Sequence, residues 1–138
     1  MKHKCGCACG AIRFEVRGAP LNAAICHCSQ CKKITGSPMF MAPAFKKADV
    51  VMERGEPKWF ESSDIAKRGF CENCGSSLFF KFNNTDTIDV LIGAFDNPGG
   101  IQPTDHLWVS NKLPWLDVDE SMPLYQTDRS KKPMNQKD

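Results

Sequence analysis

The sequence predicts a small, mainly β fold of antiparallel strands with at most one or two short helical turns. Short apolar segments with strand-like alternation recur between turn residues, and no stretch of a dozen residues keeps a clear helical period. The eight cysteines form tight clusters, which indicates that cross-linking supports the β structure. At 138 residues, one domain is the default. We expect that domain to span 1–125 and residues 126–138 to form a polar, flexible C-terminal tail.

Six segments carry the residue pattern of strands. Between Ile12 and Val16, apolar and charged residues alternate, as in a half-buried strand. Residues rich in Gly, Pro and Asn separate the strand-like segments and predict turns between them. The other five expected strands are Met39–Phe45, Lys58–Glu61, Leu78–Phe82, Ile88–Ile92 and Leu107–Val109.

One short helix is expected around Cys28–Ile34. Ser29 is a residue that starts helices, and Gly36 is a residue that ends them. The segment between them is long enough for a turn or two of helix. The sequence therefore predicts a helix that begins at Ser29 and stops before Gly36.

Composition and charge argue against several classes of partner. There are 18 basic and 16 acidic residues, a net charge of +2, which is far from the strongly basic balance of a dedicated nucleic-acid-binding domain. The apolar run Met39–Phe45 is far shorter than the ~20 residues needed to span a bilayer. The first residues show no secretory signal pattern. We predict a cytoplasmic protein with no nucleic-acid or membrane partner; the sequence does not specify its oligomeric state.

The spacing of the cysteines favours metal binding over disulfides. Neighbouring cysteines in each cluster lie two or three positions apart, a spacing that gives strained or redox-active disulfides but suits thiolates converging on one ion. In a reducing compartment, structural disulfides would not persist. The predicted ion is zinc, so the expected structure is a zinc-stapled antiparallel β fold. The clusters are Cys5, Cys7 and Cys9; Cys26, Cys28 and Cys31; and Cys71 and Cys74.

Two of these clusters each supply a cysteine pair followed by glycine. Cys7 and Cys9 precede Gly10, and Cys71 and Cys74 precede Gly75. A glycine at that position allows positive φ, so backbone N–H groups turn towards the sulfurs as in a zinc knuckle. Together the pairs complete a closed shell of four thiolates, which is typical of structural zinc. The alternative is one knuckle with stray core cysteines. We call Cys7, Cys9, Cys71 and Cys74 the four-cysteine cluster.

The middle cluster offers three sulfurs. In an extended segment, Cys26 and Cys28 face one way and His27 the other, and one helical turn brings Cys31 alongside Cys28. Three protein ligands and one open position are typical of catalytic zinc. Zinc with three thiolates is a poor Lewis acid, so the open position is better suited to an external thiol. We call Cys26, Cys28 and Cys31 the three-cysteine cluster. The alternative is a closed site, with a fourth ligand drawn from His3, Cys5, His27 and His106.

The order of motifs resembles the glutathione-dependent formaldehyde-activating (GFA) enzymes and the wider group sharing their domain, which includes centromere protein V. The resemblance runs from about residue 3 to 125. It rests on CACGAIRFE at 7–15, CHCSQC at 26–31, GSP at 36–38, GEP at 55–57, FCENCGSSL at 70–78, HLWV at 106–109 and Trp115.

The resemblance implies two zinc ions per chain in a small β fold. The four-cysteine cluster would hold the structural zinc and the three-cysteine cluster the second, catalytic one. The implied activity is that of a carbon–sulfur lyase, which makes or breaks S-hydroxymethylglutathione from glutathione and formaldehyde. The expected partners are therefore a small-molecule thiol and an aldehyde. Since one fold serves many functions, the alternative is a zinc-stapled interaction module without catalysis.

Four further residues bear on the site. Glutathione carries two carboxylates, and Lys32 and Lys33 follow the three-cysteine cluster directly, so they are expected thiol-substrate contacts, unless they belong to a solvated helix face. Cys5 lies outside the family pattern and is either a competing metal ligand or a free thiol. His106 is a general base, a partner of the site or a structural histidine. The sequence leaves the roles of Cys5 and His106 open.

Overall fold

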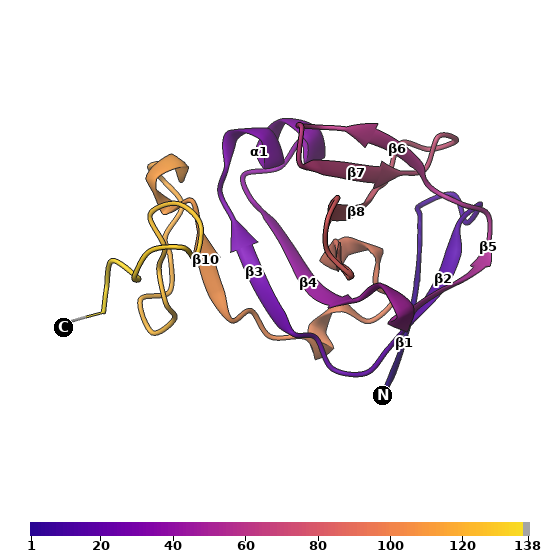
Figure 1. The fold of residues 1–138 in the computed structure, drawn as a ribbon, viewed down its shortest axis with the longest axis horizontal. Helices are drawn as coiled ribbons and strands as arrows, with labels where there is room; N and C mark the ends of the chain where they lie inside the picture. Colours follow the sequence, from indigo (N-terminus) through magenta and orange to yellow (C-terminus); the bar gives the residue numbers. More distant parts are fainter. Residues whose placement is uncertain (137–138) are drawn as a thin grey trace. The chain divides into compact units, whose positions relative to one another are not determined.

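The computed structural model describes residues 1–136 (Figure 1). The prediction of a mainly β fold is confirmed: these residues form ten strands, one α-helix and four short 3-10 turns. They divide into two compact units. Unit 1 comprises residues 1–22 and 42–101, and unit 2 comprises 23–41 and the chain from 102 onwards. Among the described residues, no helix is both long enough and apolar enough to cross a membrane.

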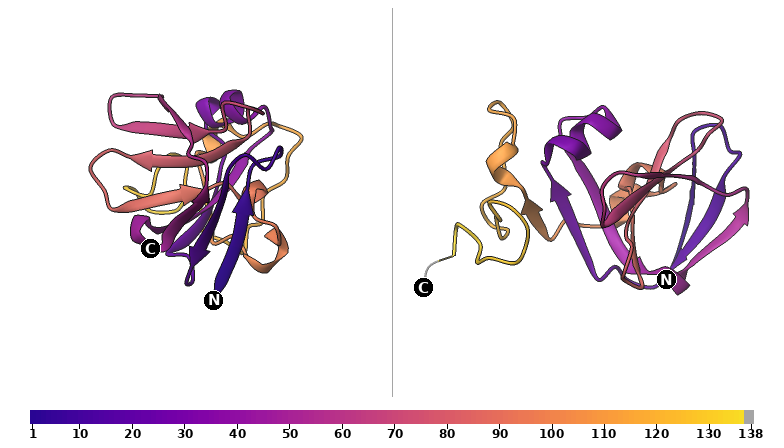
Figure 2. Two further views of the ribbon diagram at one scale, coloured as in Figure 1. Left: turned by 90° about the vertical axis from the view of Figure 1, so that its right-hand side faces the viewer. Right: turned by 45° about the horizontal axis from the view of Figure 1, so that its top comes forward.

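Unit 1 contains a three-stranded antiparallel sheet. Its strands are β1 (Lys2–Gly6), β2 (Arg13–Arg17) and β5 (Val50–Arg54), with β2 in the middle. Cys5 of β1 pairs with Phe14 of β2. Figure 2 shows this sheet from two further directions. The sequence predicts only β2, because β1 and β5 lack its alternation of apolar and charged residues.

Unit 1 also contains five strands that pair antiparallel with one another, except that the first two residues of β4 belong to unit 2. From one side to the other, the strands follow the order β4, β9, β8, β7, β6. Short 3-10 turns at Lys47–Asp49, Ile92–Ala94 and Pro98–Gly100 lie in the connections. The strands are β4 (Phe40–Lys46), β6 (Lys58–Glu61), β7 (Ala66–Phe70), β8 (Ser77–Phe82) and β9 (Thr87–Val90).

The core of unit 1 is apolar and partly aromatic. Phe14 and Phe79 are almost completely buried, and their ring centroids lie 4.9 Å apart. Phe45, Leu78 and Val90 are buried to a similar degree. Each fully buried side chain of this kind contributes about 1.5–3 kcal/mol to stability. This core fixes the strands whose connecting turns carry the four-cysteine cluster.

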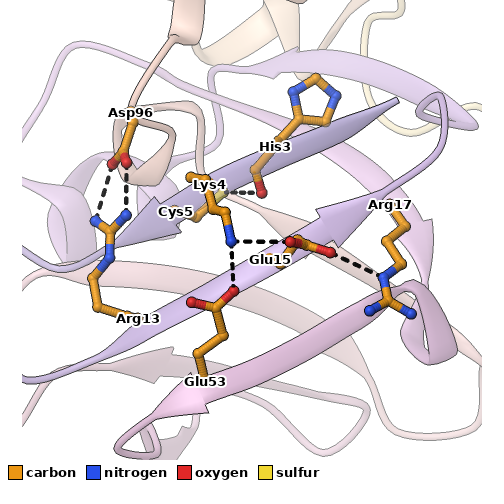
Figure 3. A network of polar contacts seen from close by, with 8 residues as sticks. All are labelled: His3, Lys4, Cys5, Arg13, Glu15, Arg17, Glu53 and Asp96. Carbon is orange, nitrogen blue, oxygen red and sulfur yellow. Dashed lines mark hydrogen bonds and ion pairs between the residues drawn. The ribbon is translucent and has the colours of Figure 1, made fainter.

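Charged side chains connect the three-stranded sheet on its surface (Figure 3). The Lys4 ammonium lies 3.0 Å from Glu15 and 2.9 Å from Glu53, so it joins all three strands. Arg13 donates two hydrogen bonds to the Asp96 carboxylate, of 3.0 and 2.6 Å. Where both partners are exposed, as in the pair of Lys4 and Glu53, such contacts add little stability.

Cys5 is a buried free thiol on the same sheet. Its side chain is fully buried, and burial raises the pKa of the thiol to about 12. The sulfur lies 3.9 Å from the carbonyl oxygen of His3 and belongs to neither cysteine cluster. Of the two expectations for Cys5, the structure favours the free thiol.

Unit 2 holds the remaining elements. β3 (Asn22–Cys26) pairs in parallel with β10 (Asp105–Leu107), an exception to the predicted antiparallel arrangement. The helix α1 (Ser29–Thr35) follows β3, and Gly36 ends it in a left-handed conformation with φ 67°. The predicted start and end of the helix are therefore confirmed.

The C-terminal segment has contacts within unit 2. Arg129 makes an ion pair with Asp105 on β10, with the nearest atoms 2.5 Å apart. Leu124 forms a bridge with His106, and the N–H of Met134 donates to the Leu124 carbonyl at 2.8 Å. The single domain ending at 125 and the flexibility of the tail stay predictions, and residues 137–138 lie outside the described residues.

One predicted strand is misplaced. The expected strand Leu107–Val109 is instead β10, which ends at Leu107, followed by a 3-10 turn at Val109–Asn111. Trp108 between them has a φ of 58°, a left-handed conformation that breaks a strand. A run of three apolar residues gave no sign of that break. The other five predicted strands are found with their ends shifted by up to two residues.

Candidate metal centres

The four sulfurs of the four-cysteine cluster lie within 4.8 Å of one another. The Sγ atoms of Cys7 and Cys9 are 3.6 Å apart, and those of Cys9 and Cys71 are 3.9 Å apart. Zinc bound tetrahedrally with Zn–S of about 2.3 Å separates its sulfurs by about 3.8 Å. The spacing of these thiols therefore fits a zinc ion.

Two similar turns present these sulfurs. Cys7 and Cys9 lie between β1 and β2, and Cys71 and Cys74 lie between β7 and β8. Gly10 and Gly75, which follow the pairs, both have a φ of 79°, as the zinc-knuckle pattern predicts. The Gly10 N–H donates to the Cys7 carbonyl at 3.2 Å, and the Gly75 N–H donates to the Cys71 carbonyl at 2.7 Å. Only a residue that tolerates positive φ closes these turns without strain.

Donors surround the sulfurs of the four-cysteine cluster. The backbone N–H of Ile12 donates to Cys7 Sγ at 3.2 Å. The side-chain amide of Asn73 donates to Cys9 Sγ, also at 3.2 Å. Hydrogen bonds to sulfur favour the thiolate, which is the form that binds metal.

Ser76 connects the two turns. Its hydroxyl lies 3.2 Å from Cys74 Sγ and accepts a hydrogen bond of 3.0 Å from the backbone N–H of Ala8. Hydrogen bonds with Ser76 lower the pKa of the Cys74 thiol to about 5. The bond with the Ser76 hydroxyl contributes most to this shift, and the bond with the Ser76 backbone comes next. The sequence analysis did not predict a role for Ser76 or Asn73, because both lie in the motif at 70–78 without being among its cysteines.

The sulfurs of the three-cysteine cluster also lie within 4.8 Å of one another. Cys26 ends β3, Cys28 is the N-cap of α1, and Cys31 lies in the first turn of that helix. The Cys28 sulfur accepts a hydrogen bond of 3.2 Å from the Cys31 N–H. A single local segment therefore brings all three thiols together, as predicted.

This cluster is more buried and more crowded than the other. Cys26 and Cys31 are buried, and their sulfurs are 3.5 Å apart. The sulfurs of Cys28 and Cys31 are 2.7 Å apart, so tetrahedral zinc would separate them by about 1 Å more. Hydrogen bonding with Cys28, then with Cys31, and burial all raise the pKa of Cys26. A bound cation would offset this penalty, which makes the donor set suitable for a metal.

Among residues 1–136, no histidine belongs to either of the two groups that could hold a metal ion. His27 is fully buried, and its Nε2 lies 2.9 Å from Nδ1 of His106 on β10. Burial lowers the pKa of His27 to about 4 and also lowers the pKa of His106. Both histidines are therefore neutral near pH 7 and bonded to each other. The alternative of a closed site finds no fourth ligand in this pair.

The lysines next to the three-cysteine cluster differ in their surroundings. Lys32 Nζ donates to the carbonyl of Asn111 at 2.6 Å, whereas Lys33 is exposed. The Asn111 amide in turn donates to Ser29 Oγ at 3.0 Å. These contacts between α1 and Asn111 could not be predicted from a sequence motif, because the partners are about 80 positions apart in the chain. A thiol-substrate contact for either lysine stays a prediction.

Fold and sulfur geometry together define a class of protein: a mainly β chain with two cysteine clusters that can each hold a metal ion. A sequence model of the glutathione-dependent formaldehyde-activating enzyme family matches residues 2–111. The chain belongs to this family. The resemblance seen in its motifs is thereby confirmed.

Individual relatives agree with this assignment. The chain is 28% identical to a putative glutathione-dependent formaldehyde-activating enzyme of Halomonas elongata over 125 residues, which is 82% of this chain and 78% of the relative. It is 35% identical over 78 residues to an uncharacterized lyase of Schizosaccharomyces pombe. That match spans 56% of each chain, so the chain matches little more than half the length of this relative.

A crystal structure of a Rhodobacter sphaeroides protein shares the fold. The TM-score is 0.56 and the sequence identity 26%, and the match covers 75% of this chain and 92% of that one.

Proposed function

We propose that the protein is a zinc-dependent carbon–sulfur lyase-type enzyme, or thiol carrier, that acts on a glutathione-like thiol and a small aldehyde. The observation that carries the proposal is the three-cysteine cluster, which has three converging sulfurs and no fourth protein ligand among the described residues. Membership of the family supports the choice of substrates. The names of the relatives, a formaldehyde-activating enzyme and a lyase, point the same way.

The four-cysteine cluster would hold one zinc ion for structure. Four thiolates leave no open position on zinc, so substrate has no access to it. Cys7, Cys9, Cys71 and Cys74 would thus fix the turn between β1 and β2 to the turn between β7 and β8. The Ser76 bond to Ala8 joins the same two turns.

The three-cysteine cluster would hold the second zinc ion. Bound there, zinc would lower the pKa of an incoming thiol, so that the thiol is held as a thiolate. Cys26, Cys28 and Cys31 would supply the three protein ligands and leave the fourth position for substrate.

The reaction itself forms or breaks one carbon–sulfur bond. The thiol sulfur joins the carbonyl carbon of the aldehyde, and the thiol proton ends on the former carbonyl oxygen; the reverse reaction returns both reactants. Lys33, which is exposed, and Lys32, which Asn111 holds in place, would contact the carboxylates of a glutathione-like thiol. We place the reaction in the cytoplasm, where thiols are kept reduced.

Calorimetry with the zinc-loaded protein tests the proposal. Glutathione titrated in two buffers of different ionisation heat should release close to one proton per molecule bound at neutral pH, because its thiol has a pKa of about 8.5–9 in solution. S-methylglutathione, which has no ionisable thiol, should bind far more weakly. Cys28→Ser is the matched protein control and should abolish the proton release.

Two results would overturn this function. If glutathione and its S-methyl analogue bind alike, the sulfur does not contact the metal. If neither binds at millimolar concentration, the chain is better explained as a zinc-stapled interaction module.

A further inference from the structure

Two buried histidines form a pair beside the three-cysteine cluster. His27 is fully buried and His106 is 4% exposed. Nε2 of His27 lies 2.9 Å from Nδ1 of His106, and the two rings lie end to end in nearly parallel planes, with centroids 5.2 Å apart and an interplanar angle of 17°. One ring donates this hydrogen bond and the other accepts it.

The histidine pair contributes poorly to the stability of the fold. The remaining ring nitrogens, Nδ1 of His27 and Nε2 of His106, are buried and have no hydrogen-bond partner among the described residues. Whichever ring donates the shared bond, one N–H and one lone pair are left unsatisfied in the interior. Buried unpaired polar groups are destabilising, and apolar side chains of similar shape would avoid that cost. Stability alone therefore does not account for two histidines at these positions.

Their position in the fold suggests another role. His27 lies between Cys26 and Cys28, and its backbone N–H donates to the Leu107 carbonyl of β10 at 3.0 Å. β3 and β10 run side by side, with Cys26 opposite Leu107 (Figure 1). The His27 ring is thus turned to His106 while its two neighbours turn their sulfurs to Cys31.

His106 is itself held firmly. Its backbone N–H donates to the Pro123 carbonyl at 3.0 Å, and its carbonyl accepts from the N–H of Tyr125 at 2.8 Å. The strand β10 therefore has a partner on each side, β3 and the segment around Leu124. A hydrogen bond to a ring on such a strand fixes the orientation of the His27 side chain.

We propose that His27 and His106 are positioning residues: their hydrogen bond keeps residues 26–28 extended, so that the sulfurs of Cys26 and Cys28 converge on Cys31. This rests on the proposed function, because it takes the three-cysteine cluster to be the second metal site. Groups behind the ligands of a metal site commonly set its affinity, and their loss costs about 10–100-fold. The pair would act on the metal through the cysteines, without binding it.

Variants of His106 test the proposal. His106→Leu removes the hydrogen bond, whereas His106→Asn keeps a polar atom close to the place of Nδ1. His106→Gln carries the same amide one bond further out and so misplaces it. Each protein is loaded with cobalt, and the affinity of each site is measured by competition with a chelator. The absorption of thiolate-bound cobalt reports the geometry of the sulfurs.

We expect His106→Leu to weaken the three-cysteine cluster about 10-fold or more and to alter its cobalt spectrum. His106→Gln should have the same direction of effect, and His106→Asn should restore affinity to within about threefold of the parent. The four-cysteine cluster should keep its affinity in all three variants. His3→Leu is the matched control, since His3 Nε2 is also buried without a partner but lies in unit 1. It should leave the three-cysteine cluster unchanged.

The outcomes separate the two proposals. A parent protein that binds only one cobalt ion would remove the second metal site and with it the proposed function. If the parent binds two ions and His106→Gln matches its affinity and spectrum, the positioning role is wrong. The glutamine variant decides the question even where His106→Leu fails to fold.

Discussion

The two cysteine clusters differ in how the chain brings their sulfurs together. The four-cysteine cluster joins turns more than 60 positions apart in sequence, and two of its thiols, Cys9 and Cys74, are exposed. The three-cysteine cluster comes from one local segment, and two of its thiols, Cys26 and Cys31, are buried. The four-cysteine cluster offers the four ligands that zinc prefers and is partly exposed to solvent. The three-cysteine cluster offers only three and is mostly buried.

This difference supports the proposal of one structural and one substrate-binding metal site. A metal ion that joins distant segments offsets the entropy of closing a long loop, so its loss affects the whole unit. A metal ion held by a strand end and one helical turn closes a short loop and contributes less to global stability. Under the proposed function, an ion in the three-cysteine cluster would therefore be free to exchange its fourth ligand without unfolding the chain.

The largest expected effect comes from breaking the four-cysteine cluster. Cys74→Ser would remove one ligand of the proposed ion between two turns, and structural zinc contributes on the order of 10 kcal/mol to folding. We expect a largely unfolded chain, measured by circular dichroism and thermal melting. Cys5→Ser is the matched control, because Cys5 is a buried cysteine outside both clusters, and it should still unfold cooperatively. A cooperative melt of Cys74→Ser near the parent midpoint would contradict the structural role.

The second effect comes from the three-cysteine cluster. Cys28→Ser should lower the zinc content from about two ions to about one per chain, given the four-ligand preference of zinc. Its melting temperature should fall much less than that of Cys74→Ser. Metal analysis and calorimetry on the same samples give both quantities. Equal destabilisation by the two substitutions would mean that both ions are structural.

A smaller effect is expected at the lysines. Lys33→Gln should weaken glutathione binding about two- to fivefold, the size of an exposed charge pair, without changing the zinc content. Lys46→Gln, an exposed lysine in unit 1, should leave binding unchanged. Calorimetric titration at two salt concentrations measures the difference. Equal affinities for the parent and Lys33→Gln would remove Lys33 from the site.

The last comparison concerns backbone strain at two glycine positions with positive φ. Gly75→Ala, in a turn of the four-cysteine cluster, and Gly36→Ala, at the end of α1, each place a Cβ in open space but at φ 79° and 67°. Backbone strain alone should cost each variant about 1–2 kcal/mol in the free energy of unfolding. Gly99→Ala, which has neither positive φ nor a neighbour within 4 Å, should stay within about 0.5 kcal/mol. Only Gly75→Ala should also weaken metal binding by the four-cysteine cluster.

The sequence by itself determined the family, the fold class and the membership of both cysteine clusters. The zinc-knuckle turns are local structures, so the spacing of Cys7 and Cys9 and the glycine after them indicate how the sulfurs turn. The helix from Ser29 is local as well, and it places Cys28 and Cys31 on one side. In these turns and in this helix, neighbours in sequence are neighbours in space, so the pattern of residues was enough.

Only the tertiary structure decided what surrounds the sulfurs. Strands β3 and β7 lack alternation because small or charged residues such as Ala23 and Arg68 are buried in them. The bond between His27 and His106 joins residues 79 positions apart, and the bond between Ala8 and Ser76 joins residues 68 positions apart. These partners are set by strand register and by the packing of whole units, and no short motif encodes register. The members of each cysteine cluster were therefore predictable from spacing, whereas the hydrogen bonds around their sulfurs depended on the folded chain.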